Sequence, residues 1–222
     1  MNFENLMRQR YSARAFLADP VPAGIIRHIL DVAQKTPSWC NTQPWEAVVT
    51  ETPAATQRLR QRLYDHAAAG GEPGPDKPFP REYVGAHDTR RKKCGAQLYE
   101  AVDIARTDRE ARARQMLRNY EFFDAPHVML VFCHESLGFY GGVDCGLYLQ
   151  SFMLAALDQG VHSIAQASLA AYPAVVREHF DVPADRHLLF GCSFGYADER
   201  HPVNRYRTER AGIADAVTFV RE

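Results

Sequence analysis

Hydrophobic residues recur along this chain with the period of a helix in some segments and of a strand in others. Ile25, Ile26, Ile29, Leu30 and Ala33 follow Asp19-Pro20-Val21-Pro22 at helical spacing. The spacing predicts a helix that ends before Pro37, because a residue that precedes proline is disfavoured in helical geometry. Pro53 opens a second predicted helix that runs to about Ala69, and Pro173–Phe180 forms another.

Two longer segments also favour helix. The segment from Gly146 to Gln159 is apolar on nearly all sides, which is typical of a helix buried in a core or in a subunit interface, and Gly160 is its predicted C-terminal cap. Asp88 to Glu121 is charged and helix-favouring. Its apolar positions are Leu98, Val102, Ala105, Met116, Leu117 and Tyr120.

Shorter apolar and β-branched runs predict strands. They span 45–50, 126–133, 161–166 and 187–196, and Val217–Val220 ends the chain with strand character. Gly191 and Gly195 mark places in the fourth run where backbone passes close to a neighbour. Helices mixed with few strands, without an internal repeat, indicate an α+β fold.

The run Gly70-Gly71-Glu72-Pro73-Gly74-Pro75-Asp76-Lys77-Pro78-Phe79-Pro80 can continue neither a helix nor a central strand. It is either a linker between two domains or a long surface loop. We favour the loop, because neither flank resembles an independent core. The interpretation is therefore one domain over 1–222, with a Gly/Pro-rich loop at 70–83 and a C-terminal arm at 211–222.

Composition removes several classes of function. The net charge is −1, with 26 Lys+Arg against 27 Asp+Glu, so the basic excess of a general nucleic-acid binder is missing. No stretch approaches the length of a membrane-spanning helix, and the first residues lack the apolar core of a signal peptide. The five cysteines are odd in number and form no CxxC pair, which favours reduced thiols and a cytoplasmic protein.

Donor-rich side chains cluster near both ends of the chain. Arg10, Ser12 and Arg14 lie within five residues, and Arg207 and Arg210 lie in a polar run near the other end. A guanidinium offers a planar fork of donors that matches phosphate. Arg10 and Arg14 would share a face if their segment were helical. The alternative is that each arginine is an ordinary solvated side chain.

A resemblance connects these runs. Arg10-Tyr11-Ser12-Ala13-Arg14, followed by Pro37-Ser38-Trp39-Cys40-Asn41-Thr42-Gln43-Pro44-Trp45, resembles the FMN-dependent nitroreductase family. The resemblance implies a central, mostly antiparallel sheet wrapped by helices. It also implies an intertwined homodimer with two FMN sites at the interface. The apolar helix at 146–159 suits that interface, and the segment at 217–220 could add a strand to the partner's sheet.

The resemblance also implies roles for residues. The first run and the C-terminal arginines would contact the FMN phosphate and pyrimidine, with Arg14 as the cation that tunes the flavin. The loop at 37–45 would be lent to the flavin of the other subunit. At 164–168 a backbone amide would meet the reactive ring nitrogen; the sequence there lacks the common Pro-x-Glu-Gly turn and resembles the subgroup with Gln-Ala-Ser-Leu. The implied cofactor-binding residues are Arg10, Tyr11, Ser12, Arg14, Pro37, Ser38, Trp39, Asn41, Gln43, Ala165, Gln166, Ala167, Arg207 and Arg210. The spacing leaves open whether Arg207 or Arg210 holds the phosphate.

Several residues keep two interpretations. Tyr11 either packs or offers a pocket hydroxyl, and Trp39 either packs in a core or interface or lines the substrate side of the flavin. Cys40 could be a nucleophile, but without a cysteine-hydrolase signature we favour a bystander thiol. Gly141-Gly142-Val143-Asp144 lacks both GxGxxG and a Walker lysine, so it predicts a turn and a helix start. We interpret the histidines without paired metal spacing as structural and expect no metal; they are His127, His134, His162, His179 and His187.

The implied activity is a ping-pong reaction. NAD(P)H (NADPH or NADH) delivers hydride to FMN and leaves, and a small electron-poor acceptor such as a nitroaromatic or quinone then takes the electrons. No side-chain general acid is required, and the partners are a second copy and small molecules, without nucleic acid or membrane. Two alternatives remain: a flavin-fragmenting or reductive dehalogenating enzyme with 70–83 as a lid, or a flavin-binding protein without turnover.

Overall fold

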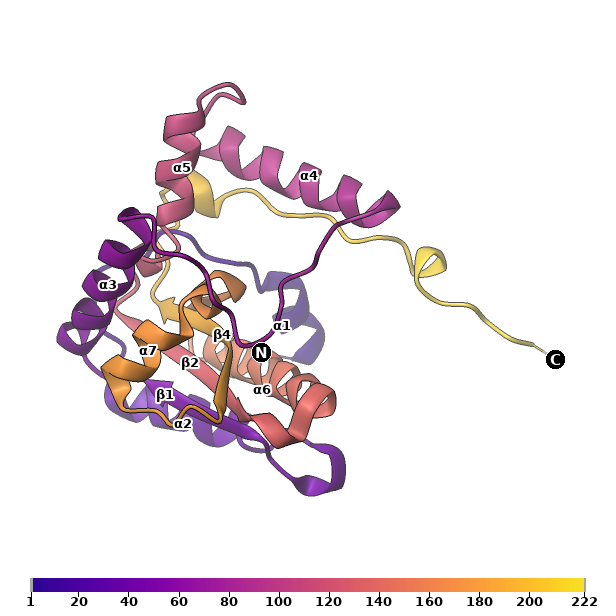
Figure 1. Ribbon diagram of the computed structural model, residues 1–222. Helices are drawn as coiled ribbons and strands as arrows, with labels where there is room; N and C mark the ends of the chain where they lie inside the picture. The colour runs from indigo at the N-terminus through magenta and orange to yellow at the C-terminus, as the bar shows by residue number, and fades with distance from the viewer. Residues whose placement is uncertain (1, 222) are drawn as a thin grey trace.

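The chain folds into one four-stranded sheet with helices on both faces (Figure 1). The structure is a computed structural model that describes residues 2–221, so positions 1 and 222 lie outside the described residues. The helices are α1 (Phe3–Gln9), α2 (Ala23–Ala33), α3 (Pro53–Ala68), α4 (Gly85–Ala101), α5 (Arg109–Leu117), α6 (Gly138–Asp158) and α7 (Pro173–Phe180). The strands are β1 (Trp45–Val49), β2 (His127–His134), β3 (His162–Gln166) and β4 (Arg186–Gly195).

The sheet has the order β1-β2-β4-β3, and every pair in it is antiparallel. Trp45 pairs with Cys133 at one end of the β1–β2 ladder, and His162 pairs with Gly195 in the β3–β4 ladder. A bulge shifts the register of β2 against β4 between Val131 and Phe132. The two central strands are therefore β2 and β4, which explains why β2 is apolar along nearly its whole length.

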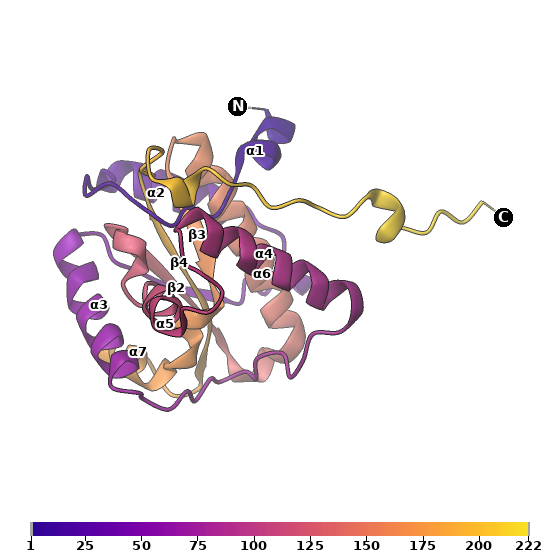
Figure 2. The ribbon, with the colours of Figure 1, turned by 90° about the horizontal axis from the view of Figure 1, so that it is seen from above.

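The alternation of side chains along β2 supplies both hydrophobic cores. Val128, Leu130 and Phe132 pack in the core that α3 and α7 cover, whereas Met129 and Val131 pack in the core that α2 and α6 cover. Figures 1 and 2 show these helix pairs on opposite faces of the sheet. The fold is thus an α+β arrangement with a mostly apolar antiparallel centre, as the sequence predicts.

The predicted helices after Pro22, at 53–69 and at 173–180, and the four internal strands are confirmed. The structure divides one of the remaining helical segments and corrects the predicted start of the other. The segment 88–121 contains two helices, α4 and α5, because the chain turns between them with a left-handed φ of 53° at Asp103. The apolar helix starts at Gly138 and so includes the glycine pair that predicted a turn. A Cβ on Gly141 would lie 2.7 Å from Cys133 Sγ, so this glycine lets α6 approach β2 closely.

Both ends of the chain differ from their predicted local structure. The segment after α1 is extended rather than helical: Ser12 bridges Ser163 of β3 in parallel, and Phe16 bridges Ala197. At the other end, the arm beyond Arg210 leaves the body with a single turn at Ile213–Asp215 (Figures 1 and 2). The predicted strand at Val217–Val220 is wrong for this single chain. Strand addition to a partner stays a prediction.

The Gly/Pro-rich loop is tied down near its middle. Its Asp76 carboxylate accepts hydrogen bonds from Arg177 Nη1 at 2.6 Å and from the backbone N–H of Leu188 at 2.7 Å. The backbone N–H of Gly74 also donates to the carbonyl of Ala171 at 2.9 Å. The first half of this loop is therefore a strap across α7 and β4.

Within residues 2–221, no helix combines the length and the apolar character that crossing a membrane requires.

Candidate functional site

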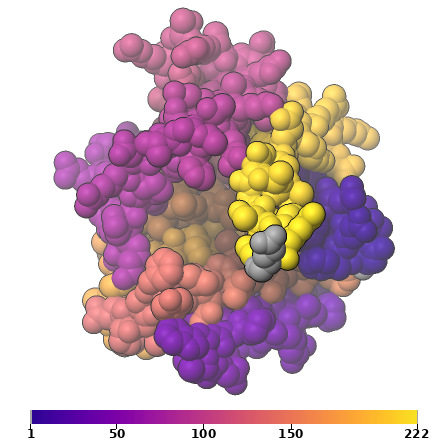
Figure 3. Space-filling model, turned by 90° about the vertical axis from the view of Figure 1, so that its right-hand side faces the viewer, coloured from indigo at the N-terminus to yellow at the C-terminus, as the bar shows by residue number. Residues whose placement is uncertain are grey.

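Cations from both ends of the chain meet in one cavity of about 420 Å³. Figure 3 shows the hollow face of the molecule, with the C-terminal segment beside α1. The residues that line the cavity are Met7, Arg8, Arg10, Tyr11, Ser12, Arg14, Cys94, Tyr206, Arg207, Thr208 and Arg210. Because the segment 10–14 is extended, alternate residues point the same way, so Arg10, Ser12 and Arg14 share one side. These groups do share one side, as predicted for a helix, but they do so because alternate residues of an extended segment point the same way.

Asn204 joins the two ends of the chain. Its side chain is buried, accepts a hydrogen bond from the backbone N–H of Arg14 at 2.8 Å, and donates to the carbonyls of Ala15 and Asp198, each at 2.8 Å. All three bonds involve backbone groups, and the carbonyls of Ala15 and Asp198 also accept from the backbone N–H groups of Asp198 and His201. One amide therefore fixes the position of Arg14 relative to the C-terminal segment.

The Arg14 guanidinium is held in a defined orientation. Its Nη1 donates to the hydroxyl of Tyr206 at 3.0 Å and to the carbonyl of Ser12 at 3.2 Å. Tyr206 is half-buried, and burial raises the pKa of its phenol. The phenol thus stays a neutral acceptor that leaves the positive charge of Arg14 intact for a neighbour in the cavity.

Arg10 is a half-buried cation without an anionic partner. Within residues 2–221 its side chain makes no hydrogen bond or ion pair. Burial lowers the pKa of Arg10, and the nearby positive charge of Arg210 lowers it further. An anion between Arg10 and Arg210 would remove both unfavourable effects, because it would replace lost solvation and screen the repulsion.

Arg207 is engaged differently from Arg210. Its guanidinium carbon lies 3.7 Å from the centre of the Tyr11 ring, and its Nη1 donates to the carbonyls of Asn204 and Tyr206. The Tyr11 ring also contacts the ring of His162 at 5.3 Å. Tyr11 therefore packs between a histidine and an arginine while it lines the cavity.

The turn after β3 offers backbone rather than side chains. Ala165 and Ala167 are exposed and small, while Gln166 is buried. Gln166 accepts a hydrogen bond from Ser193 Oγ at 2.5 Å and donates to the carbonyl of Asn119 at 2.9 Å. Its amide points into the interior, so only backbone atoms of this turn remain for a ligand.

The loop at 37–45 lies apart from the cavity, and none of its residues lines it. Its backbone is left-handed at Cys40, Asn41 and Gln43, with φ of 51°, 56° and 46°. Ser38 Oγ closes the loop by accepting from the backbone N–H of Gln43 at 2.9 Å. The single chain thus unites the arginine and serine residues of the two ends but leaves the second predicted group separate.

Trp39 is a large aromatic that this chain leaves in solvent. Its side chain is 61% exposed, which excludes a place in the core of the single chain. The ring meets the edge of Tyr140 at 4.7 Å, and its backbone N–H donates to the buried carboxylate of Asp144 at 3.1 Å. The anchored backbone and exposed ring leave the interface and substrate-side interpretations open.

Sequence reasoning missed the residues that position the cations. Asn204 and Tyr206 lie in a run that is visibly dense in donors, but nothing in the spacing showed that their partners are near the N-terminus. Asp144 falls in the glycine-containing run that predicted only a turn and a helix start. Asn119, which binds Gln166, gave no signal.

Comparisons with known proteins agree with this geometry. A family model described as the nitroreductase family matches residues 7–196. Nitroreductase NfnB of Mycolicibacterium smegmatis is 36% identical over 221 residues, covering 98% of this chain and 92% of that protein. Chloronitrobenzene nitroreductase of Comamonas testosteroni is 33% identical over 225 residues, covering 99% and 97%.

Solved structures match as closely. The FMN-dependent nitroreductase NfnB from Mycobacterium smegmatis in complex with NADPH superposes with a TM-score of 0.94 at 35% identity, covering 98% of this chain and 97% of that one. The FMN- and NADPH-dependent nitroreductase NfnB from Sphigopyxis sp. strain HMH gives a TM-score of 0.96 at 32% identity, with full coverage of both chains.

Proposed function

The chain belongs to the nitroreductase family, and from that premise we propose that it is an FMN-dependent oxidoreductase. It takes hydride from NADPH or NADH and passes the electrons to a nitroaromatic, a quinone or a similar electron-poor molecule. The relatives support this reading, since they are named as reductases of chloronitrobenzene, nitrobenzene and 4-nitrobenzoate.

The observation that carries the proposal is the pair Arg10 and Arg210 in the cavity. Their unbalanced charge fits a phosphate, and an arginine fork matches phosphate geometry. The cavity lining contains no carboxylate that would compete for the cations. Arg207 is stacked on Tyr11, whereas Arg210 lies close enough to Arg10 to lower its pKa and directs only Nη1 to Thr208 and the Glu209 carbonyl. Arg210 is therefore our choice for the second phosphate contact.

Bound FMN supplies the redox chemistry, because its ring accepts a hydride and releases electrons to a second molecule. The protein supplies position and charge. Arg14, held by Tyr206 and the Ser12 carbonyl, would present a fixed cation to the side of the flavin where negative charge accumulates on reduction. The exposed alanines at the end of β3 leave the backbone of that turn open for a flat ring.

Proton delivery needs no dedicated acid. The lining of the cavity holds cations, hydroxyl groups and one thiol, so no side chain there is a carboxylic acid. Water that reaches this open cavity supplies the protons. The reductant and the acceptor use the same opening in turn, which is the ping-pong order.

A second copy of the chain completes the site in this proposal. Most of the loop at 37–45 is polar and exposed, yet none of its residues lines the arginine cavity of its own chain. Beside it, α6 leaves Phe139, Val143 and Leu147 exposed along one stripe at helical spacing. Burial of this stripe against a partner would place each loop near the cavity of the other subunit, and the exposed apolar arm beyond Arg210 would wrap the dimer.

The alternative with a closing lid receives little support. The strap through Asp76 fixes the first half of the 70–83 loop to α7 and β4, so this half is unsuited to swing over a substrate. A flavin-binding role without turnover is an outcome of the following experiment.

The test is an anaerobic titration of the purified protein followed by its visible spectrum. We expect a yellow protein that NADPH bleaches and that regains its colour when a nitroarene is added. A yellow protein that neither NADPH nor NADH bleaches would support the binding role instead. A colourless protein that does not take up added FMN would contradict the proposal.

A further inference from the structure

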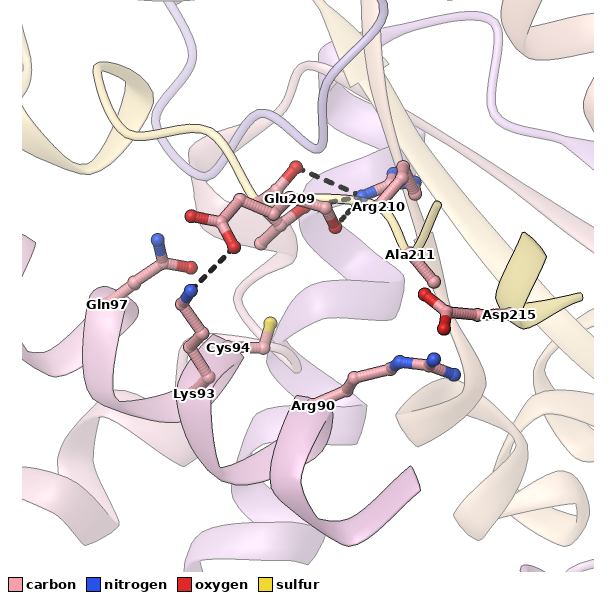
Figure 4. Close-up of a pocket in the computed structure, with 9 residues that line it drawn as sticks. Arg90, Lys93, Cys94, Gln97, Glu209, Arg210, Ala211 and Asp215 are labelled. Carbon is pink, nitrogen blue, oxygen red and sulfur yellow. Dashed lines mark hydrogen bonds and ion pairs between the residues drawn. The ribbon is translucent and has the colours of Figure 1, made fainter. Parts of the chain in front are cut away.

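A second cavity opens beside the arginine cavity, between α4 and the C-terminal segment (Figure 4). It has a volume of about 220 Å³. The residues that line it are Arg90, Lys93, Cys94, Gln97, Thr208, Glu209, Arg210, Ala211 and Asp215. Cys94, Thr208 and Arg210 line both cavities, so the two adjoin, and together they are called the groove.

The groove carries more positive charge than a single phosphate monoester needs. Its two carboxylates are Glu209 and Asp215. Its cations are Arg8, Arg10, Arg14, Arg90, Lys93, Arg207 and Arg210. A phosphate monoester brings about two negative charges at neutral pH. FMN would occupy the Arg10 end together with Arg210, which leaves Arg90 and Lys93 beside Glu209 and Asp215 at the α4 end. The room for another anion there depends on which of these two cations is held by a carboxylate.

Arg90 is the uncommitted cation at that end. Within residues 2–221 it has no ion pair, whereas its neighbours Arg91 and Lys92 share the carboxylate of Asp88. Lys93 Nζ lies 2.6 Å from Glu209 Oε2, and both side chains are mostly exposed. Such an exposed pair contributes little stability, so an incoming dianion can displace Glu209 from Lys93.

We propose that Arg90 and Lys93 bind the 2′-phosphate of NADPH and so make this enzyme prefer NADPH to NADH. This inference rests on the proposed function. The two reductants differ only in that phosphate, which is a dianion suited to a guanidinium fork next to an ammonium group. The phosphate would take the place of the Glu209 carboxylate at Lys93 and gain Arg90 as a new partner.

The first test compares reduction kinetics with the two nucleotides in the FMN-loaded protein. We expect Arg90→Ala and Lys93→Ala to raise the KM for NADPH about fivefold each, and the KM for NADH by less than about twofold. Arg91→Ala and Lys92→Ala are matched controls, because they remove the same charges from the same helix outside the groove. These controls should leave both KM values within about twofold of the wild type.

The second test measures binding without turnover, by calorimetry on the oxidised FMN-loaded protein. We expect adenosine 2′,5′-bisphosphate to bind about tenfold more tightly than adenosine 5′-monophosphate or inorganic phosphate. Glu209→Gln should tighten binding of the bisphosphate further, because it frees Lys93 and removes a repelling charge.

Outcomes that overturn the inference differ from those that overturn the proposed function. Equal use of NADPH and NADH by the wild type would refute the 2′-phosphate site. An Arg90→Ala variant with equal losses for both nucleotides would assign the groove to the shared pyrophosphate instead. If neither nucleotide reduces bound flavin, the proposed function itself fails.

Discussion

The two polar regions of this chain contrast in how they are completed. The cavity at Arg10, Arg14 and Arg210 is assembled inside one chain by hydrogen bonds between its two ends. The loop at 37–45 is equally well defined in its backbone but projects its polar side chains into solvent. The first region presents unbalanced positive charge in a cavity, whereas the polar groups of the second line no part of that cavity.

The difference teaches that a segment can have a well-defined backbone in one chain while its function requires another chain. Left-handed φ values at non-glycine residues cost free energy, so a loop that keeps three of them requires a compensating role. Among residues 2–221, none of these three residues lines the arginine cavity. A half-site built for a second copy explains both the backbone geometry and the exposure.

The largest effect is expected from a substitution that changes only the cavity at Arg10, Arg14 and Arg210. Arg10→Ala removes the half-buried cation without a protein partner, so we expect the Kd for FMN to rise about a hundredfold by fluorescence titration. Arg27→Ala is the control, because its guanidinium pairs with Glu51 on the exposed surface. Unchanged FMN affinity in Arg10→Ala would remove this residue from the site.

The next effect tests how the ends of the chain are joined. Asn204→Ala leaves the backbone N–H of Arg14 without its acceptor and removes one of the two donors to each carbonyl of Ala15 and Asp198. We expect the free energy of unfolding to fall by about 2–3 kcal/mol in urea denaturation, with weaker FMN binding as a consequence. A variant as stable as the wild type would show that Asn204 does not hold the ends together.

A smaller effect isolates the orientation of Arg14. Tyr206→Phe removes only the hydroxyl that accepts from Arg14 Nη1, so we expect FMN affinity or the rate of flavin reduction to fall about threefold. The fold should be unaffected by circular dichroism. An equally large loss in the background of Arg14→Ala would show that the hydroxyl acts independently of that cation.

The smallest effect concerns His127, a buried histidine of the central sheet that lies in neither region. His127 is buried; its Nδ1 donates to the carbonyl of Thr50 after β1, and its Nε2 accepts from the backbone N–H of Val21. Burial lowers the pKa of His127 despite the favourable bond to Thr50, so the neutral ring is the folded form. Protonation would break the bond to Val21 and weaken the link between β2 and the segment before α2.

The lowered pKa of His127 sets the direction in which the unfolding free energy changes with pH. Well above the unfolded-state pKa of about 6.5 the histidine contributes no pH dependence, and below it the unfolding free energy falls as protons favour the unfolded chain. We expect His127→Gln to reduce the slope of that loss by up to about 1 kcal/mol per pH unit, measured by urea denaturation between pH 7 and 5. An identical slope would place the acid sensitivity in other groups, such as His162.

The sequence predicted helices and strands correctly where the spacing of hydrophobic residues reflects which side chains are buried. The pattern of Ile26 and Ile29 in α2 and the apolar run of β2 each follow from contact with one core, and both elements lie where their patterns predict. The break at Asp103 and the start of α6 were missed, because local chain reversals and close packing at Gly141 leave no periodic signal.

The candidate site divides in the same way. Residue types and a resemblance predicted Arg10, Ser12, Arg14 and the C-terminal arginines as one group, and the fold gathers them. Asn204 and Tyr206 act through partners that are about 190 residues away, which no local pattern encodes. The interior orientation of Gln166 likewise depends on Asn119 and Ser193, which arrive from other elements.

The most direct test of the central claim mixes two defective homodimers. One carries Arg10→Ala, and the other carries Asn41→Gly, which removes the side chain while glycine readily keeps the φ of 56°. After unfolding and refolding together, a shared site predicts hybrid dimers that regain one FMN and one active centre, since one of their two sites is intact. No recovery in isolated hybrids would contradict the account, because it would place both groups in the site of a single chain.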